Sequence, residues 1–226
     1  MLYIVATPIG NLSDITFRAI ETLRKVDIIV CEDTRVTQKL LARYEIKDKK
    51  LMSYHHHSSD GMYEKIAAEL DDGKKLAYVT DAGTPGISDP GNKLVEFLVE
   101  HYPDVEVVPI PGASAVPTAL SVSGFAMDNF MFKGFIPHKK ARKKFLEEVE
   151  VSKTTVVFYE SVHRIQKLLS EMWQIIPDRQ IVLARELTKQ FESIYRGTAD
   201  EIRIQLEKDA VKGEFVVIVQ GNKIKK

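Results

Sequence analysis

Short apolar runs alternate with amphipathic stretches along the first half of the chain. The runs are rich in Val, Ile and Leu and have the length of buried strands, whereas the stretches between them repeat apolar residues at helical spacing. Such alternation is typical of a sheet with parallel strands and helical crossovers. Strands are expected at 2–6, 27–30, 51–54, 75–79 and 105–108, and helices at about 14–25 (with Ser13 as N-cap), after 31–35, at 61–72 and at 92–100.

The pattern changes after Gly124. Helices and strands follow one another less regularly, and residues 193–196 are expected to form a hairpin partner for the strand before them. The second half therefore predicts a separate α/β domain with a mixed sheet, so that the domains are 1–116 and 117–226. Strands are expected at 130–135, 154–159, 180–184, 193–196 and 215–219, and helices at about 115–122, 139–149, 161–173 and 198–207.

Composition limits the partners of the protein. The 226 residues contain 32 Lys and Arg and 32 Asp and Glu, so no global charge attracts nucleic acid or an anionic membrane. The uncharged stretch 107–127 is interrupted by Pro and Gly, which excludes it as a membrane span. With the single cysteine Cys31 and no signal pattern at the amino terminus, a cytoplasmic protein is expected.

The loop 79–91 follows a predicted buried strand and contains three Gly and two Pro. Glycines permit close approach to the main chain, and prolines limit the loop's freedom. In α/β sheets, ligands bind at the carboxyl ends of strands, so this loop and the small-residue loop 109–115 predict a small-molecule site. A turn-rich connector is the alternative for the first loop. Its polar side chains are Asp81, Thr84, Ser88 and Asp89.

Other strand ends carry weaker signals. The turn 7–12 lacks the glycine spacing of dinucleotide-binding or NTP-binding loops. Glu32, Asp33 and Arg35 follow the second strand, where they suit a ligand or a helix cap with a salt bridge. The histidines 55–57 lack further ligands at metal-binding spacing, so no metal site is expected.

The segment 133–144 contains six Lys or Arg and is the strongly basic patch of the chain. It suits the phosphates of a nucleic acid, or alternatively forms the solvated face of a helix whose acidic residues follow at 147, 148 and 150.

The chain contains seven motifs that together set its identity apart: TPIGNLSDIT (7–16), CEDTR (31–35), TDAGTPGISDPG (80–91), PIPGASA (109–115), FYESVHR (158–164), ARELTK with Glu192 (184–192) and GEFVVIV (213–219). In this order they resemble the motifs of the ribosomal small subunit methyltransferase I family, which has the tetrapyrrole methylase fold. The similarity covers nearly the whole chain. It implies an enzyme that uses S-adenosylmethionine (SAM) to methylate a cytidine 2′-hydroxyl in 16S rRNA of the small ribosomal subunit, and a homodimer. Two departures are Val162, where the family usually has Pro, and the histidine run 55–57.

The resemblance implies a SAM site between two α/β domains, one with a parallel five-stranded sheet and one with a mixed sheet, as in class III methyltransferases. By resemblance, the residues that contact SAM are Pro8, Asp81, Ala82, Gly83, Ile87, Ser88, Ser114, Ala115, Phe158, Leu187, Glu214 and Phe215.

Methyl transfer to a ribose hydroxyl needs alignment of the reactants and gains from a base or a cation near the oxygen. Glu160, His163 and Lys189 are the catalytic candidates, although Glu160 also suits an ion pair with Arg164 one helical turn later. The predicted RNA-binding residues are Arg35, Lys139, Lys140, Arg142, Lys143, Arg164 and Arg185. Two alternatives remain open: a methyltransferase for a tetrapyrrole-like or protein substrate, and a non-catalytic RNA-binding module.

Overall fold

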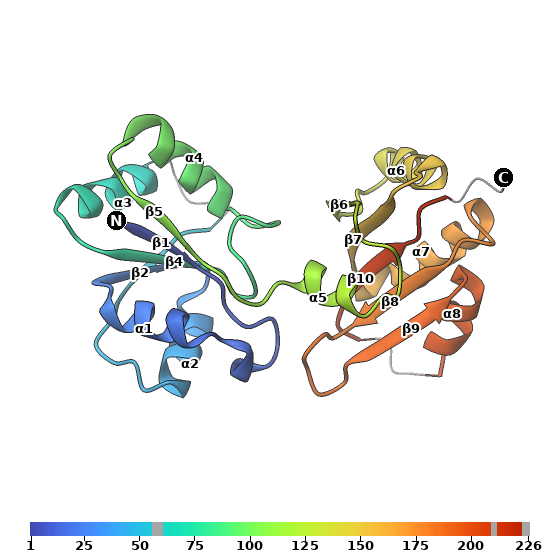
Figure 1. Cartoon of the computed structure of the whole chain (residues 1–226), viewed down its shortest axis with the longest axis horizontal. Coiled ribbons are helices and arrows are strands. Elements are labelled where there is room, and N and C mark those ends of the chain that lie inside the picture. The colour runs from blue at the N-terminus through green and yellow to red at the C-terminus, as the bar shows by residue number, and fades with distance from the viewer. Residues whose placement is uncertain (56–60, 209–211, 223–226) are drawn as a thin grey trace. The chain divides into compact units, whose positions relative to one another are not determined.

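The protein consists of two compact units, Met1–Ser114 and Ala115–Lys226. Its structure is a computed structural model that describes residues 1–55, 61–208 and 212–222 (Figure 1). Each unit has its own five-stranded sheet and its own hydrophobic core.

The first unit contains a parallel sheet in the order β3-β2-β4-β1-β5, which confirms the predicted sheet. β1 lies between β4 and β5, so that Ile4 pairs with both Tyr78 and Pro109. β2 and β4 are buried at every position, as expected for strands with helices on both faces. The strands are β1 (Leu2–Val5), β2 (Ile28–Cys31), β3 (Lys50–Ser53), β4 (Leu76–Val79) and β5 (Val107–Ile110).

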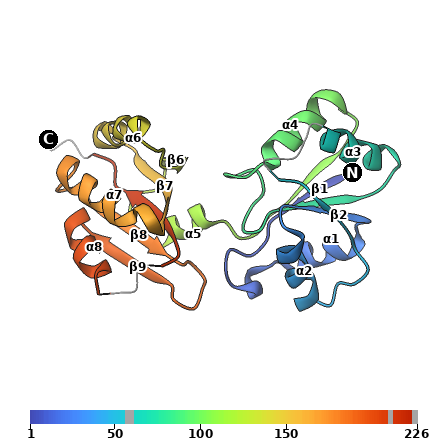
Figure 2. The same ribbon diagram turned by 180° about the vertical axis from the view of Figure 1, so that it is seen from behind.

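Two helices cover each face of this sheet (Figures 1 and 2). Leu23 of α1 and Leu41 of α2 pack with Ile29, whereas Ile66 of α3 and Leu94 of α4 pack on the opposite face. The helices are α1 (Phe17–Lys25), α2 (Thr34–Arg43), α3 (Gly61–Asp71) and α4 (Gly91–His101).

Two predicted boundaries in this unit are wrong. Ser13 lies in the short 3-10 helix η1 (Leu12–Asp14), and Thr16 caps α1 by accepting from the backbone N–H of Ala19. Both residues are good caps, so the local sequence did not distinguish them. The fifth strand lies two residues later than expected and includes Pro109, which is tolerated because β5 is an edge strand.

The second unit contains a mixed sheet in the order β6-β7-β10-β8-β9, as predicted. β6 and β7 are parallel, and the other neighbours are antiparallel. Because β10 runs opposite to β7 and β8, its first residues lie beside the last residues of those two strands. The strands are β6 (Phe130–Phe135), β7 (Thr155–Ser161), β8 (Ile181–Arg185), β9 (Ser193–Gly197) and β10 (Glu214–Val219).

Three helices, α6 (Lys140–Val151), α7 (Val162–Ile175) and α8 (Ala199–Leu206), bury one face of this sheet. The short helix α5 (Ala115–Ser121) contacts β10, and in Figure 2 it lies on the other side of the sheet from α7. None of the helices in the described part of the chain is long and apolar enough to cross a membrane.

Candidate functional site

Three loops meet at the carboxyl edge of the parallel sheet in the first unit. Thr7, just after β1, and Gly83, after β4, exchange two backbone hydrogen bonds of 3.0 and 3.1 Å. The Thr84 hydroxyl donates to the carbonyl of Ala113, after β5, at 3.1 Å. The Thr7 hydroxyl is buried and donates to the Thr80 carbonyl at 3.1 Å. The loops therefore form one connected surface.

The topology explains why this edge suits a ligand. The chain leaves β1 toward α1 on one face of the sheet and leaves the neighbouring β4 toward α4 on the other face. Such a switch point is where open α/β sheets bind ligands. The structure brings together here the predicted cofactor residues of this unit, which are Pro8, Asp81, Ala82, Gly83, Ile87, Ser88 and Ser114.

Gly83 lies where the loops are closest. Its φ of +89° belongs to the region that glycine adopts readily. A Cβ at this position would lie 3.3 Å from Cγ2 of Ile9 and 3.8 Å from the Ala113 carbonyl oxygen. Gly83 is buried and both of its main-chain polar groups are bonded to Thr7, so the missing side chain lets the loops approach one another closely.

The loop after β4 is held by the Asp89 carboxylate. It accepts hydrogen bonds from the backbone N–H groups of Gly86 at 2.9 Å, Ile87 at 3.0 Å and Gly91 at 2.8 Å. The buried Tyr54 hydroxyl donates to the Pro90 carbonyl at 3.0 Å. These contacts hold the exposed tip of the loop before any ligand binds.

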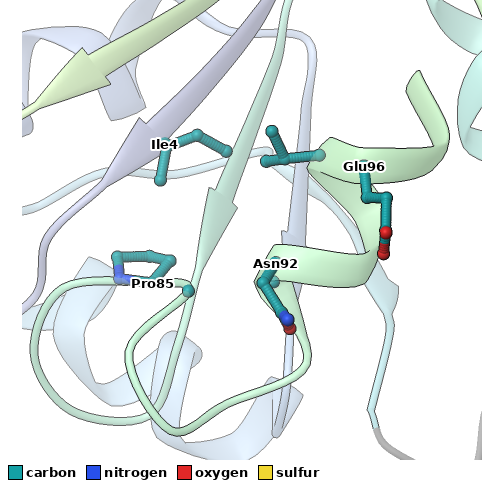
Figure 3. Close-up of a pocket in the computed structure, with 7 residues that line it drawn as sticks. Ile4, Pro85, Asn92 and Glu96 are labelled. Carbon is teal, nitrogen blue, oxygen red and sulfur yellow. The ribbon is translucent and has the colours of Figure 1, made fainter. Parts of the chain in front are cut away.

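An open pocket of about 500 Å³ lies beside the same loop (Figure 3). Its lining is mostly apolar and comes from β1, the loop after β4, and α4. None of the lining residues is a predicted cofactor residue. The proposed ligand site therefore rests on the three hydrogen-bonded loops after β1, β4 and β5, and not on this pocket. The lining residues are Ile4, Pro85, Gly86, Gly91, Asn92, Val95 and Glu96.

Asp81 connects this edge to the end of β2. Its carboxylate accepts from the backbone N–H of Asp33 at 3.0 Å. Partial burial raises the pKa of Asp81, and the nearby Asp33 carboxylate adds to the rise. Asp33 also caps α2 and pairs with Arg35, whose side chain is exposed. The capping alternative for Asp33 and Arg35 is thus confirmed, and Arg35 still faces solvent.

In the second unit, Glu160 lies on the helix-covered face of β7 and is 1% exposed. We expected it just beyond the strand, but β7 continues to Ser161. Its carboxylate is 3.0 Å from Nη1 of Arg142 and 2.8 Å from Nε of Arg164, and it accepts from the backbone N–H of Ser161. The expected pair with Arg164 is confirmed.

Arg142 is also buried, at 7% exposed. It comes from α6 and bridges Glu160 to Glu171 of α7, with Nε 2.6 Å from the Glu171 carboxylate. Its Nη2 is buried without a hydrogen-bond partner among the described residues. The basic segment is therefore divided, because Arg142 points into the unit while Lys139 and Lys143 are exposed. Nothing is described of the Lys140 side chain.

Phe158, Phe215 and Leu187 are buried as well. Phe158 packs edge-on against Phe145 in the core, and Phe215 belongs to the same cluster. Because both phenylalanine rings are buried in the core, these two residues could contact a ligand only through their main chain.

Lys189 follows β8 and pairs with two carboxylates, Glu186 at 2.9 Å and Glu214 at 2.7 Å. Partial burial lowers its pKa, but the hydrogen bonds to Glu214 and Glu186 outweigh that effect and leave the pKa raised. Lys189 is thus an ammonium ion at neutral pH. Arg185 is buried and donates to the Lys212 carbonyl, whereas His163 at the start of α7 is exposed.

Comparisons with known proteins agree with this architecture. The sequence profile of the family described as Tetrapyrrole (Corrin/Porphyrin) Methylases matches residues 1–203. The chain belongs to the tetrapyrrole methylase family.

Within the tetrapyrrole methylases, the chain is similar to proteins named ribosomal RNA small subunit methyltransferase I, which confirms the family inferred from the motifs. The Halalkalibacterium halodurans protein is 47% identical over 222 residues, which are 98% of this chain and 76% of that protein. The Bacillus subtilis protein is 46% identical over 98% of this chain and 75% of its own length. The Thermotoga maritima protein is 44% identical over 97% of this chain and 98% of its own length.

Solved structures of other proteins share the fold at low identity. A cobalt precorrin-4 methyltransferase superposes with a TM-score of 0.72 at 18% identity, over 97% of this chain and 94% of that one. Diphthine synthase gives 0.69 at 13% identity, over 97% and 89%. These structural similarities establish the fold of the chain.

Some residues that shape the site of this tetrapyrrole methylase were missed from the sequence. Thr7 and Tyr54 hold the loops and were not singled out, whereas Asp89 was named among the polar side chains of its loop but not as the group that holds it. Among the described residues, no group of three His, Cys, Asp or Glu could hold a metal ion. His56 and His57 lie outside the described residues.

Proposed function

We propose that this tetrapyrrole methylase transfers a methyl group from SAM to the 2′-hydroxyl of a cytidine in 16S rRNA. The supporting observation is the identity of 43 to 47% to proteins named ribosomal RNA small subunit methyltransferase I, over 96 to 99% of this chain. The same proposal includes a small ribosomal subunit as substrate, a homodimer and a cytoplasmic location.

The three hydrogen-bonded loops after β1, β4 and β5 would hold SAM, which supplies an electrophilic methyl group on a sulfonium sulfur. The missing side chain at Gly83 lets the three loops lie close together, and Asp81 and Ser88 offer exposed polar groups beside it. Pro8, Asp81, Ala82, Gly83, Ile87, Ser88 and Ser114 would hold it there. In the second unit, Ala115, Phe158, Leu187, Glu214 and Phe215 would contribute, the two phenylalanines through their main chain.

On the substrate side, the Lys189 ammonium would stabilise negative charge that develops on the ribose oxygen. Because its pKa is raised, Lys189 is not suited to accept the proton. His163 is exposed, and a neutral imidazole carries one ring nitrogen that can accept a proton, so it is our choice for the proton acceptor. Glu160 would act as a positioning residue that holds Arg164.

The exposed cations would contact phosphates of the RNA. Lys139 and Lys143 are exposed near the start of α6, and Arg35 is exposed at the start of α2. The paired Arg164 is half-buried and would contribute one edge of its guanidinium, and Lys140 belongs to the same basic segment. Arg142 and Arg185 are buried, so we assign them to holding α6 and residue 212 in place.

Small ribosomal subunits that lack the modification provide the test, with radiolabelled SAM as methyl donor. The expected result is label in 16S rRNA, recovered as 2′-O-methylcytidine after digestion. Label on a base, or on protein, would contradict the proposed site of transfer. The same protein is then given a corrin precursor, because the cobalt precorrin-4 methyltransferase shares its fold. Transfer to that precursor alone would replace the RNA proposal.

A further inference from the structure

Four aromatic side chains share one face of the sheet edge formed by β6 and β7. Phe130 pairs with Thr155, Phe132 with Val157 and Phe135 with Tyr159. Paired residues point to the same face, and alternate residues of β7 do so as well. Phe130, Phe132, Phe135 and Tyr159 therefore form one row, called here the aromatic strip.

A β-bulge places Phe135 in this row. The register between β6 and β7 shifts between Phe132 and Phe135, and Gly134 within the shift has a φ of +62°. Without the extra residue, Phe135 would follow Phe132 by an odd number of positions and would point to the opposite face. Bulges commonly redirect a side chain in this way near functional sites.

The Tyr159 ring contacts Phe132 and Phe135, and the outer rings Phe130 and Phe135 are exposed. The Tyr159 ring lies 5.1 Å from Phe132 and 5.2 Å from Phe135, measured between centroids. Phe135 is 57% exposed and Phe130 is 43% exposed. The strip lies on the face opposite to α6, α7 and α8, because Phe158, between Val157 and Tyr159, packs with those helices. The strip therefore lies on the face of β6 and β7 that these three helices do not cover.

Positive charge lies at the end of the strip. The chain leaves Phe135 toward His138 and Lys139, both of which are exposed. Nη1 of Arg164 donates to the Ile136 carbonyl at 3.1 Å and lies 3.2 Å from Nε2 of His138. In a single nucleic acid strand, the bases stack on aromatic rings and the phosphates pair with cations, so this surface suits such a strand. An apolar protein partner would offer no negative charge to these cations.

We propose that the aromatic strip stacks unpaired nucleobases of the rRNA substrate, with Phe135 as the most accessible ring. This inference rests on the proposed function and adds a binding site for bases that flank the methylated nucleotide. Each stacked base is worth about 1 to 3 kcal/mol by truncation of the aromatic residue, or about 5- to 150-fold in affinity.

The test compares Phe135→Leu, which keeps an apolar side chain but removes the ring, with wild type. Affinity is measured by fluorescence anisotropy on a labelled single-stranded RNA and on the same RNA with abasic sites. We expect the variant to bind the intact RNA about 5-fold or more weakly and to bind the abasic RNA as wild type does. Trp173→Leu is the matched control, because Trp173 is 50% exposed on α7 and lies away from the strip.

Equal affinity of Phe135→Leu and wild type for the intact RNA would overturn the inference, as would an equal loss on the abasic RNA. A change from dimer to monomer in sedimentation, with affinity per chain unchanged, would assign the strip to a contact between copies of the chain. Methylation of small subunits by wild type is assayed in parallel. If wild type methylates small subunits and the variant binds RNA normally, only the inference about the aromatic strip is wrong. If wild type does not methylate small subunits, the proposed function itself is wrong.

Discussion

Replacing Glu160 by Gln tests how the second unit is held together. The carboxylate is fully buried between two guanidinium groups, and the Arg142 side chain is only 8% exposed. Gln keeps the shape but is neutral, and it presents one acceptor oxygen in place of two. The variant therefore leaves the buried Arg142 guanidinium with less negative charge to balance it.

Removing one partner of a buried ion pair costs about 3 to 5 kcal/mol. Because the amide still accepts a hydrogen bond and Glu171 still pairs with Arg142, we expect a somewhat smaller loss, about 2 to 4 kcal/mol. At the usual urea sensitivity of small domains, the unfolding midpoint then falls by about 1 to 2 M.

The single tryptophan provides the assay. Trp173 lies in α7, so its fluorescence during urea unfolding reports the second unit. Glu147→Gln is the control, because Glu147 forms an exposed pair with Lys143 at 3.8 Å and such pairs contribute little. Glu160→Gln combined with Arg142→Met is expected to cost less than the sum of the two single changes, since both act on one network.

A midpoint for Glu160→Gln within about 0.2 M of wild type would refute this reasoning. A loss of about 100-fold in the single-turnover methylation rate, at unchanged stability, would instead assign proton transfer to Glu160.

Three further predictions concern both units. Gly83→Val is expected to weaken SAM binding in calorimetry while the circular dichroism spectrum stays unchanged, because a branched side chain is strained at this φ; wild-type affinity would remove the loop from the site. Lys189→Met is expected to lower the methylation rate about 10²-fold or more with SAM affinity retained; a normal rate would exclude Lys189 from charge stabilisation. Hydrogen bonds from Lys50 and then Lys74 lower the pKa of Glu69 to about 2, so its contribution to stability is present above about pH 4.5 and is lost as the pH falls toward 2. Glu69→Gln should therefore differ from wild type in urea unfolding followed by circular dichroism at about pH 6 and converge with it at about pH 2; an equal difference at both values would contradict the lowered pKa.

Much of the fold followed from local patterns. The apolar runs at 27–30 and 75–79 became β2 and β4, buried at every position, because only strands covered on both faces tolerate such uninterrupted runs. The loop 79–91 was placed correctly at the end of β4, since Gly and Pro act on the backbone locally, whereas the expected loop 109–115 overlaps the last two residues of β5 and the first of α5. The roles of individual cofactor and RNA-binding residues stay predictions.

The chain's sequence by itself determined the family, the order of the elements and the two kinds of sheet. Only the tertiary structure decided which charged residues face solvent. Arg142 lies in a basic run and Glu160 in a polar motif, yet both are buried against each other, because α6 and β7 bring together residues 18 positions apart. The bulge at Gly134 likewise depends on the pairing of two strands, and it moves Phe135 to the aromatic face. Burial and register depend on contacts between distant segments, and a local pattern does not contain that information.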